Sequence, residues 1–340
     1  MNSNHDIFLN SVRNSKTIVT STDVISKDES LLLEELKLRE EAGNYQISSK
    51  AENTKAAYVS DWLHFEDFCK KFGYPCMPVD EENYVLYISS LALHGNKPNT
   101  IIRKMTSISQ VHKANGFADP TTYKISKVLS GVRSKHRAKA KGKTPILVDM
   151  LILMLDHVPD NLKGIRDKAL LLIGFQGAFR RSELVSLDLE NITFDAQGIS
   201  IELAYSKTDK EVNGEIVGIP YGQSPMTCPV KSLKRWIEVA DIQNGPIFLG
   251  INRHGQVSVK RLSDRSVALI VKEYVKKTGR DESKYAAHSL RSGFVSSAAM
   301  AGSSERSIMA QTRYSSEKML RSYVRKGTVF EDNAASNTGL

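Results

Sequence analysis

Between residues 52 and 137 the apolar residues recur at the three- and four-residue spacing of amphipathic helices. The first helix gathers large apolar side chains on one face: Tyr58, Trp62, Phe65 and Phe68. Three further helical segments are expected at about 81–93, 98–115 and 121–137. Glycine- and proline-containing stretches separate them, and such stretches break helices. This part of the chain therefore predicts a small all-helical domain.

After residue 145 the pattern changes. Residues 147–157 and 165–174 have helical spacing, whereas residues 198–205 alternate as a half-buried strand does. A polar turn closed by Asn213-Gly214 leads to a returning strand at 215–220. Helices are then expected at 229–240, 263–278, 290–301, 304–311 and 316–326. The pattern predicts a mainly α fold, in which the second domain is mixed α+β with a small antiparallel sheet.

The chain divides into four predicted parts. Residues 1–50 are rich in Ser, Asn and Thr and are expected to form a flexible tail with one short amphipathic helix at 30–42. Residues 51–137 form the helical domain, 138–145 a basic linker, and 146–340 the second domain.

The charge balance favours a polyanionic partner. The 340 residues include 47 Lys and Arg against 38 Asp and Glu, a formal charge of +9. Residues 1–50 hold six basic and eight acidic side chains, so the remainder carries +11. A run without acids spans 133–143. It is either a solvated linker or a segment that lies along phosphates.

The three cysteines, Cys69, Cys76 and Cys228, are too few for a disulfide framework and lack zinc-ligand spacing. No metal site and no Gly-rich phosphate loop is expected. The chain lacks an apolar run of membrane-spanning length and a signal peptide. We therefore expect a cytoplasmic protein without a membrane partner.

Candidate chemistry lies in three short motifs. Ala287-His288-Ser289-Leu290-Arg291 places a titratable histidine one helical turn before an arginine, and Tyr323 follows between Arg321 and Arg325. Arg180-Arg181-Ser182-Glu183-Leu184 adds an arginine beside a carboxylate. Arginine forks match the geometry of phosphate oxygens, and tyrosine is a nucleophile for covalent catalysis. Each motif alone has an ordinary structural explanation, but together they indicate cleavage of a phosphodiester by tyrosine.

In order and spacing, these motifs resemble the tyrosine recombinase (phage integrase) family, with the layout of Cre-type enzymes, over about residues 50–330. The resemblance implies an N-terminal core-binding domain, a C-terminal catalytic domain and no cofactor. It implies that Arg180 and Arg291 hold the phosphate oxygens and that Glu183 braces the first arginine. Lys207 would be the general acid for the leaving 5′ oxygen, with Lys210 as the alternative.

The same resemblance makes Tyr323 the nucleophile of a 3′-phosphotyrosine intermediate, assisted by His288. One position departs from the family: Tyr314 stands nine residues before Tyr323, where the family usually has His or Trp. Its phenol can donate one hydrogen bond to a phosphate oxygen. A second interpretation, that Tyr314 is itself the nucleophile, stays open.

The resemblance also implies double-stranded DNA with a specific site of inverted repeats, a homotetramer on two sites, a Holliday junction and association with the nucleoid. Candidate DNA-binding residues are Lys55, Lys97, Arg103 and Lys104 in the first domain, Arg137, Lys139 and Lys141 near the linker, and Lys260, Arg261 and Arg265 at the opening of a helix. Residues 328–340 would dock on a neighbouring subunit. A type IB topoisomerase and a non-catalytic DNA-binding protein of the same fold are the alternatives.

Overall fold

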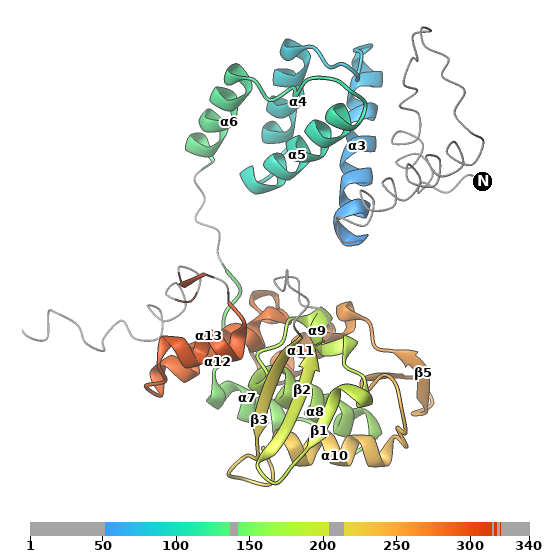
Figure 1. The fold of residues 1–340 in the computed structure, drawn as a ribbon, viewed down its shortest axis with the longest axis vertical. Coiled ribbons are helices and arrows are strands. Elements are labelled where there is room, and N and C mark those ends of the chain that lie inside the picture. The colour runs from blue at the N-terminus through green and yellow to red at the C-terminus, as the bar shows by residue number, and fades with distance from the viewer. Residues whose placement is uncertain (1–51, 137–141, 204–213, 315, 318–319, 321–340) are drawn as a thin grey trace, which may run out of the picture. The chain divides into compact units, whose positions relative to one another are not determined.

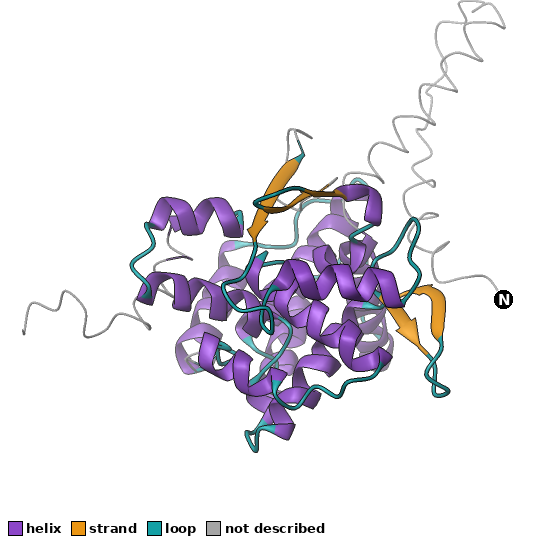
Figure 2. Ribbon diagram, turned by 90° about the horizontal axis from the view of Figure 1, so that it is seen from below, coloured by secondary structure: helices purple, strands orange, loops and turns teal. Residues whose placement is uncertain are grey.

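The computed structural model describes residues 52–136, 142–203, 214–314, 316, 317 and 320 (Figure 1). The chain divides into two compact units, with the boundary between residues 140 and 141, and each unit has its own hydrophobic core. Helices make up most of the described chain (Figure 2), and its strands all belong to the second unit. This confirms the mainly helical fold with small antiparallel sheets that the sequence predicts. None of the described helices is long and apolar enough to cross a membrane.

The first unit contains the helices α3 (Glu52–Phe72), α4 (Glu81–Leu93), α5 (Pro98–Ala114) and α6 (Tyr123–Lys135). Their starts follow from local chemistry. The Asp80 carboxylate accepts the backbone N–H of Glu82 at 3.0 Å before α4. Pro98 opens α5, where its missing N–H costs nothing. Sequence spacing therefore located all four helices to within a few residues.

Aromatic rings and one buried histidine join these helices. Phe65 and Tyr87 are fully buried, with ring centroids 4.9 Å apart and tilted edge to face. His112 Nε2 accepts the backbone N–H of Val79 at 3.1 Å, so Nδ1 carries the proton that is donated to the Ile108 carbonyl at 2.9 Å. Burial lowers the pKa of His112 below its ordinary value, which favours this neutral form.

The second unit contains the helices α7 (Val148–Leu155), α8 (Leu162–Gln176), α9 (Arg181–Ser186), α10 (Pro229–Val239), α11 (Asp264–Lys277), α12 (His288–Met300) and α13 (Glu305–Thr312), and two short 3₁₀ turns at Leu189–Asn191 and Glu282–Lys284. Helix α8 is its centre, since most of its residues are buried and it packs against α10 and α12. The ends of α8, α12 and α13 carry the candidate site.

One antiparallel sheet has the strand order β1 (Ile192–Phe194), β2 (Gly198–Leu203) and β3 (Glu215–Pro220). Its buried face is apolar: Ile201 pairs with Val217, and Ile199 pairs with Ile219. The period-two alternation of β2 in the sequence has this cause, because one face of the sheet meets the core.

A buried polar network ties α8 to α11 and to β4. Asp167 is fully buried and accepts two N–H groups of the Arg166 guanidinium, at 2.9 and 2.6 Å. The Tyr274 hydroxyl donates to the other Asp167 oxygen at 3.0 Å. A third nitrogen of Arg166 donates to the Leu249 carbonyl at 3.3 Å. Each buried charge thus has a partner, as burial requires.

Two further strands, β4 (Leu249–Ile251) and β5 (Val257–Arg261), form a hairpin that the sequence pattern does not predict. The pattern instead places Lys260 and Arg261 at the opening of a helix. This prediction is wrong, because both residues end β5, and helix α11 begins at Asp264 after its cap, Ser263. Strands of three and five residues carry too little alternation to stand out from a loop.

Candidate active site

Arg180 and Glu183 meet where α9 begins. Arg180 lies directly before the helix, and Glu183 is its third residue. The Glu183 carboxylate accepts the backbone N–H of Arg180 at 2.9 Å and also binds the Arg180 guanidinium. A carboxylate at this helical position caps the free N–H groups of the first turn, so the local sequence itself creates the pair. The Arg180 side chain remains 27% exposed, open to an incoming anion.

The neighbouring arginine lies outside this pair. Arg181 Nε forms an ion pair with Asp264 at 3.1 Å, and 55% of the Arg181 side chain is exposed. The register of the Ser-Glu-Leu motif in the sequence selects Arg180 over Arg181. The geometry agrees with that choice, because Arg180 is the one that contacts Glu183.

Arg291 joins the turn after α8 to the end of α13. It lies on α12 one turn after His288, and only 1% of it is exposed. Its Nη1 donates to the Ala178 carbonyl at 2.5 Å, and its Nη2 donates to the Thr312 carbonyl. The last carbonyls of a helix lack partners within the helix, so a buried guanidinium satisfies them and suits the helix dipole. These two hydrogen bonds use two of the five N–H donors of the Arg291 guanidinium.

Tyr314 follows α13 and lies against Arg291. The guanidinium carbon of Arg291 is 4.5 Å from the centroid of the Tyr314 ring, within cation–π distance. Tyr314 is 7% exposed and packs in a small apolar cluster with Val295, Ile308 and Leu320. Its position beside the second arginine is therefore that of a buried supporting group.

Arg313 is a member of this cluster that sequence reasoning missed. It is 8% exposed, and its Nη2 forms an ion pair with Glu183 Oε2 at 2.8 Å. Its Nη1 donates to the Gln311 carbonyl at 2.9 Å. The sequence offered one weak signal, a basic residue at the end of a helix, where cations are favoured. Nothing in the motif pattern pointed from residue 313 to residue 183.

The carboxylate of Glu183 is held ionised. Burial raises its pKa, but Arg313 and the hydrogen bonds from Arg180 outweigh burial and bring the pKa below its ordinary value. Glu183 is therefore negative at neutral pH between two arginines. Burial lowers the pKa of Arg291 as well, yet the guanidinium stays charged because its ordinary pKa is so high.

His288 is the first residue of α12, and its side chain is open to solvent. Partial desolvation lowers the pKa of the imidazole, and the cations Arg291 and Arg180 lower it further. At neutral pH His288 is thus uncharged and able to accept a proton.

The cluster brings together five of the seven catalytic residues that the sequence predicts: Arg180, Glu183, His288, Arg291 and Tyr314. Lys207, its alternative Lys210 and Tyr323 lie outside the described residues. Within the described residues no group of His, Cys, Asp and Glu is placed to hold a metal ion. Chemically the cluster is a cationic, partly desolvated site that fits an anion.

The DNA-binding residues expected in the first unit differ in exposure. Lys97 is exposed before α5, and Lys55 is half-buried on α3. Arg103 remains 43% exposed while it pairs with Asp61 at 2.6 Å. Lys104 requires a correction: it is 8% exposed, and its ammonium lies 3.4 Å from the buried Asp61 carboxylate, so it neutralises an internal charge and faces no groove. Arg137, Lys139 and Lys141 lie outside the described residues.

In the second unit Lys260 and Arg265 are exposed. The Arg261 side chain is 35% exposed but has partners within the unit. Its guanidinium pairs with Asp188 at 2.6 Å and donates to the Val185 carbonyl at 2.7 Å. These contacts fasten β5 to the end of α9 and to Asp188 just after it, so Arg261 has a structural role within the unit.

The comparison with known proteins identifies the class. The model of the phage integrase family matches residues 148–328. The chain is 44% identical over 291 residues to the integrase/recombinase xerD homolog of Selenomonas ruminantium, which covers 84% of this chain and 85% of that protein. It is 29% identical to the tyrosine recombinase XerC of Thermodesulfovibrio yellowstonii, over 75% of this chain and 80% of that protein. The chain belongs to the phage integrase family.

Within that family the protein is a tyrosine-type site-specific recombinase, an enzyme that breaks and rejoins DNA. Solved structures share its fold. The Tn1549 transposon integrase in complex with circular intermediate DNA has a TM-score of 0.57 and 16% identity, covering 81% of this chain and 90% of that chain. The XerH recombinase bound to a palindromic substrate has a TM-score of 0.56 and 17% identity, covering 76% of this chain and 72% of that chain. The topoisomerase and non-catalytic alternatives are not favoured.

Proposed function

We propose that the protein exchanges strands between two duplex target sites through a 3′-phosphotyrosine intermediate, with Arg180 and Arg291 as the phosphate-binding groups. The observation that supports this most is the convergence of both arginines on one cluster. Arg291 binds the carbonyl of Ala178, and Arg180, two residues further on, is paired with Glu183. Two guanidiniums at one partly desolvated site would neutralise the charge that develops on a pentacoordinate phosphate.

The covalent step follows from the roles of the remaining residues. The Tyr323 hydroxyl oxygen attacks phosphorus, and the bond from phosphorus to the 5′ oxygen breaks. The neutral His288 imidazole accepts the phenol proton, and Lys207 donates a proton to the 5′ oxygen. The reverse sequence rejoins the DNA, because the phosphotyrosine conserves the bond energy.

Tyr314 takes a supporting part in this scheme. A nucleophile must reach a backbone phosphate, whereas Tyr314 is 7% exposed, with its ring against Arg291. We infer that it orients Arg291 through the contact of its ring with the guanidinium.

We propose that the target is a pair of inverted repeats bound by four protomers, and that recombination passes through a Holliday junction in nucleoid-associated complexes. The palindromic substrate of the XerH neighbour supports inverted repeats. A symmetric site matches a symmetric protein assembly, since each half-site meets an identical binding surface.

The assembly contact in this proposal is the segment after residue 326. A groove of about 390 Å³ between α7 and the segment after β3 is lined by apolar residues such as Val148, Ile152 and Phe175. Val148 and Ile152 are 43% and 42% exposed, so they offer apolar surface to a docking segment. Val329 and Phe330 supply apolar side chains of a size that fits such a groove.

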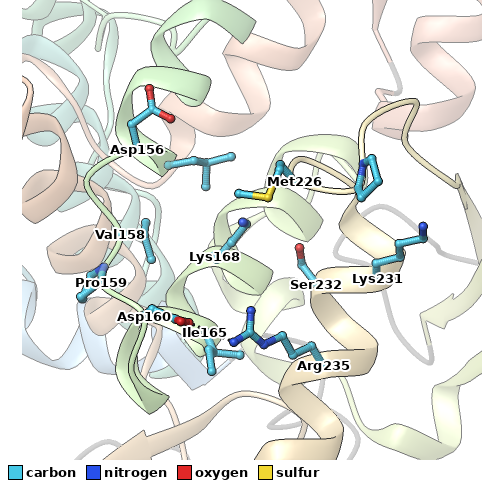
Figure 3. A pocket seen from close by; sticks show the side chains of 13 residues that line it. Asp156, Val158, Pro159, Asp160, Ile165, Lys168, Met226, Lys231, Ser232 and Arg235 are labelled. Atoms are coloured by element: carbon cyan, nitrogen blue, oxygen red, sulfur yellow. Dashed lines mark hydrogen bonds and ion pairs between the residues drawn. The ribbon is translucent and has the colours of Figure 1, made fainter.

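The two acidic residues that follow Phe330, Glu331 and Asp332, also have a matching site. A pocket of about 520 Å³ adjoins the groove at Leu155, and Figure 3 shows the side chains of Lys168 and Arg235 extending into it. Burial and the nearby Arg235 lower the pKa of Lys168, whereas Asp156 and Asp160, which also line the pocket, raise it. Asp160 already pairs with Arg235 at 2.9 Å, so Lys168 is the cation that an added carboxylate would meet. Glu331 and Asp332 directly follow Phe330 and would supply it. A neighbouring copy is therefore the occupant that we propose.

The experiment begins with inverted repeats beside the encoding gene. Nicked suicide duplexes carrying them should trap a covalent protein–DNA complex with the wild-type chain and none with Tyr323→Phe. Absence of trapping on a site that the protein binds would argue for a non-catalytic protein. Relaxation of arbitrary supercoiled plasmid by monomers would argue for a topoisomerase.

Assembly is tested by truncation after Lys326. The truncated chain should bind a single site as the full chain does but lose synapsis and recombination. The paired change of Val329 and Phe330 to Ser should have the same effect, and Asn337→Ser, a polar exchange in the same segment, serves as the matched control. Equal recombination by the truncated chain would exclude docking through this segment.

A further inference from the structure

Arg313 occupies a backbone conformation that arginine rarely adopts. Its φ of 56° and ψ of 41° lie in the left-handed region, directly after α13. Glycine is the usual residue there, because a Cβ is unfavourable at positive φ. A large charged residue persists in such a place when contacts of its side chain hold it. The contacts of Arg313 therefore decide what it does.

Those contacts connect α13 to α9 and to the sheet. The Arg313 guanidinium pairs with Glu183 at 2.8 Å, and its Nε lies 3.5 Å from Glu215 on β3. Nη1 donates to the Gly177 carbonyl at 3.3 Å, and the guanidinium carbon is 5.2 Å from the Phe179 ring centroid. The side chain is 4% exposed, so it is well placed to act on its neighbours but cannot itself reach DNA.

Four charged groups on the described elements surround the Glu183 carboxylate or its partner. Arg180 comes from the start of α9, Arg291 from α12, Arg313 from the end of α13, and Glu215 from β3. The charge of Arg313 is the largest single cause that lowers the Glu183 pKa, and Arg180 adds two hydrogen bonds and its own charge. Oxygen Oε2 of Glu183 receives Arg313, and oxygen Oε1 receives the Arg180 guanidinium. The carboxylate thus lies between a buried arginine on one side and a partly exposed arginine on the other.

We propose that Arg313 is a positioning residue, which holds the Glu183 carboxylate against Arg180 and thereby sets the orientation in which Arg180 meets the scissile phosphate. The inference rests on the proposed function of Arg180. It assigns to the end of α13 a part in the first arginine box, 130 residues earlier in the chain. Arg313 and Tyr314, consecutive in sequence, then support the two arginine boxes in parallel, one through Glu183 and the other through Arg291.

The test uses Arg313→Gly, because glycine suits the left-handed backbone and removes the guanidinium without adding strain. On a suicide duplex with the cognate repeats, we expect kcat for cleavage to fall on the order of 10- to 100-fold with KM for DNA unchanged, since a misaligned phosphate-binding group costs that much. Arg313→Lys retains the charge and should recover part of the rate. Arg306→Ala, an exposed arginine of the same helix, is the control.

A pH profile separates positioning from general loosening of the fold. Without Arg313 the pKa of Glu183 rises, so Glu183 becomes protonated at a higher pH, and the acid side of the rate profile should move to higher pH. In a Glu183→Gln background Arg313→Gly should produce no such shift. In a Glu215→Gln background the shift should persist. Cleavage by Arg313→Gly at the wild-type rate and with the wild-type pH profile would overturn the inference.

Failure of the wild-type chain to cleave would count against the proposed function, and the coupling would then be measured by unfolding. The unfolding midpoint of the wild-type chain should exceed that of Arg313→Gly at neutral pH. The difference between the two unfolding midpoints should narrow as pH falls through the pKa of Glu183. A carboxylate whose pKa is lowered by folding stabilises the folded state, and protonation in acid removes that stabilisation. A gap independent of pH, or one unchanged by Glu183→Gln, would overturn the inference.

Discussion

Substitution of Gly293 by alanine should destabilise the second unit and disturb the site together. Gly293 lies on α12, two residues after Arg291, where the backbone of the helix passes close to the backbone of Ile146. A Cβ at this position would lie 1.8 Å from the Ile146 carbonyl oxygen and 2.6 Å from its carbon. Both obstructing atoms belong to the backbone, so no side chain can rotate away.

The magnitude follows from what must move. Non-bonded atoms pack at well over 3 Å, so the two backbones must separate by roughly 1–2 Å. The Ile146 N–H donates to the Ser289 carbonyl of α12 at 2.9 Å, and the Ile146 side chain is fully buried. Overpacking costs about 1–3 kcal/mol and the strained hydrogen bond about 1 kcal/mol, giving a loss of about 2–4 kcal/mol.

The two tryptophans of the chain make the assay specific, because Trp62 belongs to the first unit and Trp236 to the second. In a Trp62→Phe background, the fluorescence of the buried Trp236 reports unfolding of the second unit alone. Gly293→Ala should lower the denaturant midpoint with an unchanged slope. Gly218→Ala is the matched control, since a Cβ there meets nothing within 4 Å.

The same displacement should affect catalysis, since α12 carries His288 and Arg291. DNA cleavage by Gly293→Ala should fall even at denaturant-free conditions where the unit stays folded. An equal midpoint for Gly293→Ala and Gly218→Ala, with equal cleavage rates, would refute the reasoning about close approach.

Buried groups and helix propensity give three more expected outcomes. Tyr274→Phe leaves the fully buried Asp167 carboxylate without a hydroxyl donor and should cost about 1–3 kcal/mol in the Trp236 unfolding assay, an effect absent if water replaces the hydroxyl. Because the pKa of His112 is lowered in the folded state, the neutral imidazole stabilises the first unit above the ordinary histidine pKa, and this stabilisation is lost as pH falls. The first unit should therefore unfold more readily at pH 5 than at pH 7. This pH dependence should be weaker in His112→Gln. Gly131→Ala, on the exposed face of α6 with nothing within 4 Å, should stabilise the first unit by about 0.5–1 kcal/mol, and a lower midpoint would contradict this.

The elements that the sequence revealed are those with strong local signals. The four helices of the first unit combine sustained apolar spacing with glycine or proline boundaries, and β2 and β3 show clear alternation. Strand β1 and the β4–β5 hairpin escaped because segments of three to five residues depend on their partner strands for definition. Helix α8 begins at Leu162, earlier than its apolar run suggests, because Asn161 caps it and accepts the Gly164 N–H at 2.9 Å.

Burial of charged residues was the least predictable feature. Lys104 and Lys97 look alike in the sequence, yet the first neutralises the buried Asp61 and the second is exposed. Arg313 belongs to no sequence motif, and its role depends on its ion pair with Glu183, which lies far away in the chain. A basic side chain carries the same charge in both settings, so only its three-dimensional neighbours distinguish a DNA contact from an internal ion pair.

The sequence by itself determined the class of this protein, because local periodicity specifies helices and the order of Arg180, His288, Arg291 and Tyr323 specifies a chemistry. The tertiary structure decided how the described part of the site is held. It directs Arg291 onto the carbonyls of Ala178, in the turn after α8, and of Thr312, the last residue of α13, and places Arg313 behind Glu183. Two of these contacts, Arg291 with Ala178 and Arg313 with Glu183, join segments more than a hundred residues apart. They arise from the packing of α8, α9, α12 and α13, which no local pattern encodes.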